Sequence, residues 1–144
     1  MYLGILGGMK MIVYREIGAE LVDEISEIYQ RASWGAYLGD KEKLVRTFKN
    51  SLYILGAFHE NQLVGFVRCV GDGEHIVYVQ DLIVDVEYKR QAIGKNLITK
   101  AMEKFSNVRM FTLITDAMDD TSNLFYKAIG LKQYNNNGLV GYFR

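Results

Sequence analysis

Stretches of the chain that repeat apolar residues every three or four positions have the pattern typical of amphipathic helices. They cover residues 19–32, 41–50, 92–105 and about 119–129. Asp40 stands just before the second stretch, where its carboxylate can cap the helix N-terminus. The pattern therefore predicts helices that each bury one face against a common core.

Between these stretches lie short runs rich in β-branched and aromatic residues, which are typical of strands. They cover residues 11–17, 52–59, 62–70, 75–85, 108–115, 131–134 and 139–143. Tight-turn signals at residues 60–61 and 71–74 separate the second, third and fourth runs, so these should form an antiparallel meander.

The order β-α-α-β-β-β-α-β-α-β-β predicts a mixed α/β fold (α+β in part) with a central mixed, mostly antiparallel sheet and helices on both faces. Where a parallel strand follows the antiparallel meander, neighbouring strands can splay and leave a crevice for a ligand. We expect one domain over residues 1–144, with residues 1–10 as a loose leader.

The composition of the chain argues against several classes of protein. Seventeen basic residues balance 17 acidic ones, and this zero net charge argues against bulk nucleic acid as the partner. Cys69 is the only cysteine, so an intramolecular disulfide is excluded, and we expect it to be a core residue. His59 and His75 lie in no ligand motif, so no metal is expected. No apolar run is long enough for a membrane span, and we expect a cytoplasmic location.

The stretch "VDVEYKRQAIGKNL" (84–97) joins a predicted strand to a predicted helix. The first N–H groups of a helix bind anions, and Lys89, Arg90 and Lys95 add positive charge. Ala92 and Gly94 leave room for a pyrophosphate to approach the backbone. The turn is therefore either a phosphate cradle or an ordinary solvated basic connection.

Two motifs resemble those of the GNAT superfamily of N-acetyltransferases. "DLIVDVEYKRQAIGKNL" (81–97) is similar to its acyl-CoA-binding motif, R/Q-x-x-G-x-G/A at the start of a helix, with Lys89, Ala92 and Gly94 at the motif positions. "DDTSNLFYKAIGLKQY" (119–134) is similar to the second motif, and its matching residues are Phe125, Tyr126, Gly130 and Leu131.

The chain departs from both motifs. Lys89 keeps the charge of an arginine and loses its planar fork, and Val86 stands where proline is usual. Ala92 replaces the first glycine, which costs nothing unless that position needs a positive φ. Asp119 and Ser122 replace the asparagine and alanine of the second motif.

The resemblance implies a GNAT-like acyl-CoA N-acyltransferase fold and acetyl-CoA as co-substrate, without a metal. The residues it assigns to binding acetyl-CoA are Leu82, Ile83, Val84, Lys89, Arg90, Gln91, Ala92, Ile93, Gly94, Lys95, Asp119 and Ser122. It implies a pantetheine arm running beside the strand at 82–84, and direct attack by an amine on the acetyl group in a ternary complex.

The resemblance also places Tyr126 at the general-acid position; the alternative is that this aromatic side chain belongs to the core, and the motif favours the general acid. Asp81 is a carboxylate in an apolar strand, and two roles stay open for it: a general base with a pKa raised by burial, or an acceptor of structural hydrogen bonds. Tyr78 and Gln80 are candidates to orient a water.

The acceptor amine is expected to be a primary amine of a small molecule or peptide. Trp34 and Tyr37, between the first two predicted helices, could line its site or could simply pack the helices together. The alternative function is a non-catalytic acyl-CoA-binding module with the same fold. Exposed C-terminal strands that pair between subunits would give a homodimer.

Overall fold

The computed structural model describes residues 10–144, so most of the expected leader lies outside the described residues. The chain forms two compact units, the first ending at Leu113 and the second running from Ile114 to Arg144. Each unit is described by itself below.

A five-stranded sheet organises the first unit. Its strands are β1 (Val13–Glu16), β2 (Tyr53–His59), β3 (Gln62–Gly71), β4 (Ile76–Val84) and β5 (Met110–Leu113). Its helices are α1 (Val22–Arg31), α2 (Lys41–Lys49) and α3 (Ile93–Lys104). Each lies within a few residues of its predicted range, and a 3-10 turn, η2 (Ala19–Leu21), precedes α1.

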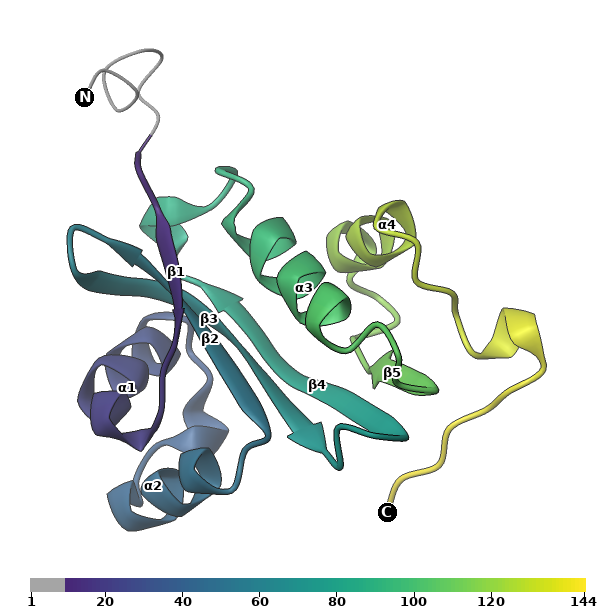
Figure 1. Ribbon diagram of the computed structural model, residues 1–144, viewed down its shortest axis with the longest axis horizontal. Helices are drawn as coiled ribbons and strands as arrows, with labels where there is room; N and C mark the ends of the chain where they lie inside the picture. Colours follow the sequence, from purple (N-terminus) through teal and green to yellow (C-terminus); the bar gives the residue numbers. More distant parts are fainter. Residues whose placement is uncertain (1–9) are drawn as a thin grey trace. The chain divides into compact units, whose positions relative to one another are not determined.

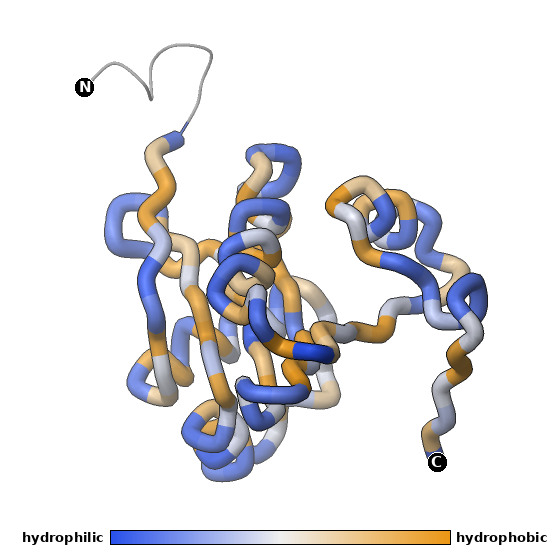
Figure 2. The backbone as a smooth tube through the Cα atoms, turned by 45° about the vertical axis from the view of Figure 1, so that its right-hand side comes forward, coloured by the Kyte–Doolittle hydropathy of each residue, from blue (hydrophilic) through white to orange (hydrophobic). Residues whose placement is uncertain are grey.

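The strands lie in the order β1-β2-β3-β4-β5, as Figure 1 shows. The pairs from β1 to β4 are antiparallel, and β4 pairs with β5 in parallel across the α3 crossover. The predicted meander and the mixed sheet are therefore confirmed. Hydrophobic residues concentrate along the central strands in Figure 2.

Helices cover both faces of this sheet. On one face, α1 and α2 bury Ile25, Ile28 and Phe48 against Phe66 and Ile83. On the other face, α3 packs over β2, β3 and β4, burying the residues Ile93, Leu97, Ile98 and Ala101. The Asp40 carboxylate accepts a hydrogen bond from the N–H of Lys43 at 3.0 Å, which confirms the predicted cap of α2.

Strand β4 contains a bulge at Gln80. Arg68 of β3 lies opposite Asp81, but the next residue of β3, Cys69, lies opposite Val79, so Gln80 has no counterpart. Because directly opposite residues point to the same face, Val79 faces α3 with Cys69, while Asp81 faces α1 with Arg68. In a regular strand these two residues of β4 would share a face.

The second unit contains α4 (Asp120–Ala128) and a 3-10 turn, η5 (Asn135–Asn137). The strands predicted at 131–134 and 139–143 are wrong, since neither range is a strand in the structure. In 139–143 the apolar residues are exposed, with Tyr142 94% and Phe143 97% accessible, whereas Leu131 and Tyr134 are partly buried. An extended segment becomes a strand only when a neighbour accepts and donates its backbone hydrogen bonds.

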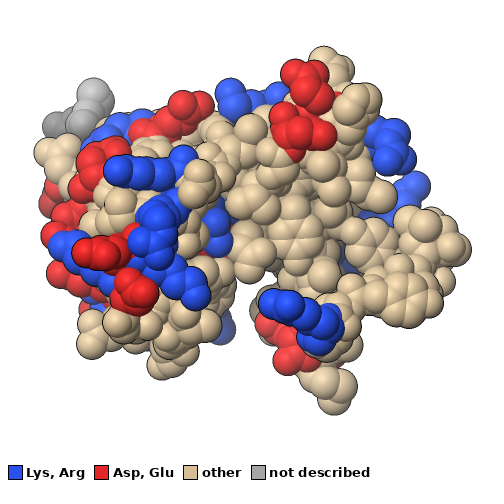
Figure 3. All heavy atoms as spheres, turned by 90° about the horizontal axis from the view of Figure 1, so that it is seen from below, with Lys and Arg blue, Asp and Glu red and all other residues tan. Residues whose placement is uncertain are grey.

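Among the described residues, no helix has the length and apolar character needed to cross a membrane. Acidic and basic side chains are intermingled on the face shown in Figure 3.

Candidate active site

The edge of β4 beyond Val79 is open in the first unit. The β4–β5 pairing begins at Ile76↔Met110 and ends at Val79↔Leu113, whereas β4 continues to Val84. Residues 81–84 therefore pair with β3 on one side and, among the described residues, with no strand on the other. The end of this pairing lies where a crevice was expected, at the point where a parallel strand joins an antiparallel meander.

The alternation of the strand determines which backbone groups face that open edge. The N–H of Asp85 donates to the Val64 carbonyl of β3 at 2.8 Å. Since the N–H and C=O of one strand residue point the same way and alternate along the strand, Ile83 also faces β3, and Leu82 and Val84 face the open edge. Of the three residues expected to hold a pantetheine arm, two present free backbone groups, while Ile83 buries its side chain against α1 and α2.

The loop from β4 to α3 ends in a run of backbone N–H groups. Arg90 and Ala92 have φ of 66° and 62°, and α3 begins at Ile93. Left-handed residues among right-handed ones turn successive N–H groups to one side and form a concave anion site, and the N-terminus of α3 adds its dipole. The predicted cradle residues Gln91, Ile93, Gly94 and Lys95 lie in this segment.

The backbone conformation of Ala92 differs from the one expected. We expected alanine to cost nothing here in a right-handed conformation, but the structure gives it a left-handed one, with φ 62° and ψ 14°. A Cβ in that region is strained by about 1–2 kcal/mol, and a glycine would not be. The cradle keeps its shape at a cost in stability.

The charge around the cradle is positive. Lys89, Arg90 and Lys95 are exposed, and none forms an ion pair with a carboxylate of the described chain. Two acidic residues lie in the same loop: Glu87 is exposed, whereas Asp85 is buried. Arg31 of α1 binds Oδ2 of Asp85 from Nη2 at 2.7 Å and from Nε at 2.9 Å. The basic side chains are therefore available to an anionic ligand.

On the opposite face of β4, the Asp81 carboxylate is the centre of a buried network. Oδ2 accepts hydrogen bonds from Tyr29 at 2.8 Å and from Nε of Arg68 at 2.6 Å, and Oδ1 accepts one from Tyr37 at 2.7 Å. The side chain of Asp81 is 1% exposed and that of Arg68 is 5% exposed. This geometry supports the structural alternative for Asp81, because each of its oxygens already has a donor.

The protonation states agree with this arrangement. Burial, reinforced by the Asp81 carboxylate, raises the pKa of Tyr29 far above its usual range. Burial and the hydrogen bond to Asp81 also raise the pKa of Tyr37. Burial lowers the pKa of Arg68, but the attraction of Asp81 outweighs it and leaves that pKa raised. Both phenols therefore remain donors, and the guanidinium remains charged.

The network extends toward the residues predicted for the acceptor. Tyr37, in the 3-10 turn η3 (Gly35–Tyr37), stacks on Tyr29 with centroids 4.3 Å apart, and it accepts a hydrogen bond from Nε2 of Gln80 at 3.2 Å. Trp34 stacks on Tyr29 at 6.0 Å and is 36% exposed. The structure thus brings Tyr37 and Gln80 to Asp81 and gives both aromatic side chains a packing role.

Tyr78 lies on the segment of β4 that pairs with β5. It is opposite Thr112 of β5 and Val70 of β3, and it is partly buried. Gln80, the bulge residue, has an exposed side chain.

In the second unit, Asp119 and Ser122 bind each other. The Asp119 carboxylate caps α4 by accepting from the N–H of Ser122 at 3.0 Å, and the Ser122 hydroxyl donates to it at 2.7 Å. Tyr126 is partly buried, beside Phe125 with centroids 5.2 Å apart. Burial, with a smaller contribution from Asp119, raises the pKa of Tyr126.

Cys69 is fully buried in β3, and burial raises the pKa of its thiol to about 12. Since only the thiolate is a nucleophile, this cysteine is inert at neutral pH, as the sequence predicted. No group of three or more His, Cys, Asp or Glu side chains that could hold a metal occurs in residues 10–144.

Sequence reasoning missed Tyr29 and Arg68. Tyr29 lies within the apolar pattern of the helix predicted over 19–32, and Arg68 was not singled out. The signal was present, because an arginine within the apolar run "VGFVRCV" needs a buried anion as partner. Asp81, in the neighbouring predicted strand, is such an anion.

A family model described as the acetyltransferase (GNAT) family matches residues 16–131. Among solved structures, a GNAT family acetyltransferase from Streptococcus pneumoniae TIGR4 has a TM-score of 0.80 and 28% identity, covering 93% of this chain and 97% of that chain. No match was found among curated proteins.

Other structures with the same fold are more distant in sequence. A PaiA N-acetyltransferase from Thermoplasma acidophilum, in complex with coenzyme A, has a TM-score of 0.69 and 21% identity, covering 85% of this chain and 90% of that one. An aminoglycoside acetyltransferase from an uncultured soil metagenomic sample, in complex with sisomicin, has a TM-score of 0.71 and 19% identity, covering 92% and 95%.

Replacing Asp81 by Asn should lower the free energy of unfolding by about 3–5 kcal/mol, because it leaves the buried Arg68 guanidinium without a counter-charge. Urea unfolding measures the loss. Adding Arg68→Met removes the orphaned charge, so the double variant should be more stable than Asp81→Asn alone. Asp23→Asn, at an exposed ion pair, is the control and should change stability by less than about 1 kcal/mol. An equal loss of stability in Asp81→Asn and Asp23→Asn would contradict the structural role of Asp81.

Replacing Ala92 by Gly should raise the free energy of unfolding by about 0.5–1 kcal/mol, because relief of the left-handed strain exceeds the extra entropy of glycine in the unfolded chain. The matched control is Ala101→Gly in the right-handed interior of α3, which should lower stability by about 1 kcal/mol or more. A loss of stability in Ala92→Gly would show that the loop is not left-handed at this position.

Proposed function

Because the chain belongs to the acetyltransferase (GNAT) family, we propose that it is an N-acetyltransferase that transfers the acetyl group of acetyl-CoA to a primary amine of a small molecule or peptide. The observation that supports this most directly is the open edge of β4, which leads straight into the N–H cradle before α3. An extended arm and a pyrophosphate need these two features in this order.

The chain's own residues fit acetyl-CoA in both respects. The backbone groups of Leu82 and Val84 are free to hydrogen-bond an extended arm, as an added strand would. The N–H groups around Ala92 and Ile93, with the side chains of Lys89 and Arg90, would hold the pyrophosphate. When bound, acetyl-CoA would supply an activated thioester as the acyl donor.

Direct attack needs an uncharged amine. A lysine-like amine has a pKa near ~10.4, so losing its proton at neutral pH costs roughly 4–5 kcal/mol. Both oxygens of Asp81 already accept hydrogen bonds, so in our proposal it is a positioning residue that fixes Tyr37 and the bulge. The amine's proton then leaves to water near Gln80. Holding both substrates together supplies much of the rate.

Tyr126 is proposed to donate a hydrogen bond to the departing thiolate. Because its pKa is raised above that of an ordinary tyrosine, and a thiol has a pKa near ~8.5, complete proton transfer to sulfur is uphill. A hydrogen bond that strengthens as charge develops on sulfur still lowers the barrier.

Replacing Gly94 by Glu should abolish acetyl-CoA binding. A Cβ at Gly94 would lie 3.7 Å from Cγ2 of Val84, so a longer acidic side chain would occupy the junction of open edge and cradle and repel phosphate. Thermal unfolding across an acetyl-CoA titration measures binding, since saturation at 100 times Kd stabilises the native state by about 2.7 kcal/mol. Gly94→Ala, whose methyl makes only an ordinary contact, is the control and should still bind. A wild-type midpoint that does not move with acetyl-CoA would refute the proposal.

Replacing Tyr126 by Phe should lower kcat by about 10–100-fold and leave the Kd for acetyl-CoA unchanged, because the lost hydrogen bond acts only in the transition state. Steady-state release of free thiol measures kcat, and the thermal titration measures Kd. The loss should shrink with an acyl donor whose leaving thiol is more acidic. Tight acetyl-CoA binding without turnover on any amine would instead identify the chain as a non-catalytic acyl-CoA-binding module.

A further inference from the structure

The N–H cradle lies in a loop that has little regular structure. The loop begins with a 3-10 turn, η4 (Val86–Tyr88), and residues 89–92 after it belong to no helix or strand. Two of them, Arg90 and Ala92, have the left-handed backbone conformation that shapes the cradle. Without the hydrogen bonds of a helix or a sheet, this segment depends on its two ends for its position.

The two ends of the segment are held in different ways. On the carboxyl side, the N–H of Asn96 in α3 donates to the Ala92 carbonyl at 2.9 Å, and Ile93 is buried in the core. On the amino side, Tyr88 directly precedes the segment, and it is the buried residue of η4. The side chain of Tyr88 is therefore the candidate for the second anchor.

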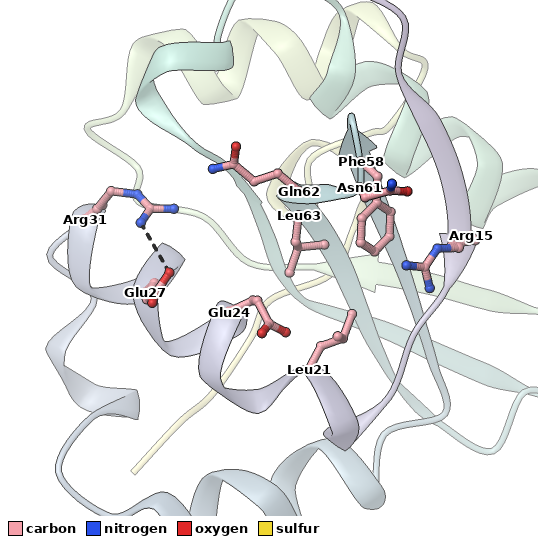
Figure 4. A pocket seen from close by; sticks show the side chains of 9 residues that line it. All are labelled: Arg15, Leu21, Glu24, Glu27, Arg31, Phe58, Asn61, Gln62 and Leu63. Carbon is pink, nitrogen blue, oxygen red and sulfur yellow. Dashed lines mark ion pairs between the residues drawn. The ribbon is translucent and has the colours of Figure 1, made fainter.

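Asp85, at the start of the loop, is too far along the chain for this task. Arg31 binds its carboxylate at 2.7 Å, and Figure 4 shows Arg31 at the end of α1, where it also lies 3.9 Å from Glu27. This contact fixes the end of β4 to α1, but η4 separates it from the cradle.

The Tyr88 hydroxyl lies 2.7 Å from Nδ1 of His59, the last residue of β2. The neighbouring Phe58 lines the cavity beside α1 together with Leu63, as Figure 4 shows. Because successive residues of a strand point to opposite faces, His59 points to the face that α3 covers. The hydrogen bond therefore fastens the amino side of the cradle to the sheet face on which α3 holds the carboxyl side.

The His59–Tyr88 pair is mostly shielded from water. Tyr88 is 7% exposed, and the side chain of His59 is 21% exposed. The two rings lie with centroids 5.4 Å apart, and Nζ of Lys10 lies 4.1 Å from the centroid of the Tyr88 ring. Water competes less for a hydrogen bond in such surroundings, so the pair can hold the loop in place.

The other ring nitrogen of His59 indicates the direction of this hydrogen bond. Nε2 lies 3.9 Å from a carboxylate oxygen of Glu60. Because a carboxylate only accepts, it favours the neutral tautomer with the proton on Nε2. We therefore assign Nδ1 of His59 as the acceptor and the Tyr88 hydroxyl as the donor.

We propose that His59 and Tyr88 are positioning residues for acetyl-CoA. Their hydrogen bond holds residues 89–92 in the conformation in which the N–H groups converge on the pyrophosphate. Without the bond, the loop adopts other conformations as well, and the apparent Kd rises as the fraction of molecules with a formed cradle falls. This inference rests on the proposed function, since it requires that the cradle binds acetyl-CoA.

Replacing Tyr88 by Phe removes the hydroxyl and keeps the ring. The Kd for acetyl-CoA should rise about tenfold, the effect of losing one hydrogen bond that the bound conformation needs. His59→Leu should raise the Kd by a similar factor. The double variant should be no worse than either single variant, because both substitutions remove the same bond. Thermal unfolding across an acetyl-CoA titration measures the Kd of each variant.

His59→Asn separates positioning from packing. The Oδ1 atom of asparagine takes roughly the place of Nδ1 of histidine and can accept from Tyr88, so this variant should bind acetyl-CoA as the wild type does. If His59 only filled space, Asn and Leu at this position would not differ in this direction. The matched controls are His75→Leu, at an exposed histidine, and Tyr53→Phe, at the opposite end of β2. Both should bind acetyl-CoA normally.

The unfolding curves without ligand show that each variant is folded, and Tyr88→Phe keeps the test open if His59→Leu does not fold. An unchanged Kd in Tyr88→Phe, or a loss in His59→Asn equal to that in His59→Leu, would overturn this inference alone. A wild type that does not bind acetyl-CoA would refute the proposed function, and the positioning role with it. The two failures are therefore distinguishable.

Discussion

The buried ion pair between Asp81 and Arg68 is the interaction on which the arrangement of the first unit depends. Taking both charges out of water is costly, and the cost is offset only because two tyrosine hydroxyls and a guanidinium converge on one carboxylate. These donors come from α1, from η3 and from β3. One side chain of β4 therefore fixes the distance and orientation of a helix, a loop and a strand.

The same strand serves two purposes on its two sides. Toward α1 it carries the polar network, and along its free edge it presents unpaired backbone groups. The bulge at Gln80 separates the two, because it lies where the pairing with β5 ends. The stretch of this chain that resembles the GNAT acyl-CoA-binding motif covers the end of this strand and the loop after it. Within residues 10–144, this stretch combines an edge that pairs with no second strand and a cluster of N–H groups.

Most of the fold followed from the sequence because periodicity is a local signal. The helices, the meander and the Asp40 cap are each encoded within a dozen residues. The bulge could not be predicted from the sequence, because β4 is covered on both faces. Every second residue of β4 is buried, as in a regular strand: Val77, Val79, Asp81 and Ile83. The left-handed Ala92 and the partners of Asp81 depend on distant parts of the chain. The predicted C-terminal strands are wrong because a strand needs a neighbouring strand, and a local sequence pattern does not show whether one is present.

The bulge makes the direction in which the side chains of β4 point depend on one extra residue. Before the bulge, the odd-numbered residues of β4 face α3. After the bulge, the odd-numbered residues face α1. Removing a single residue at this point would merge the halves into one register and turn either Asp81 toward α3 or Val79 toward α1. An aliphatic substitution in β4 would disturb packing locally, whereas a one-residue deletion would exchange the polar and apolar faces of half the strand.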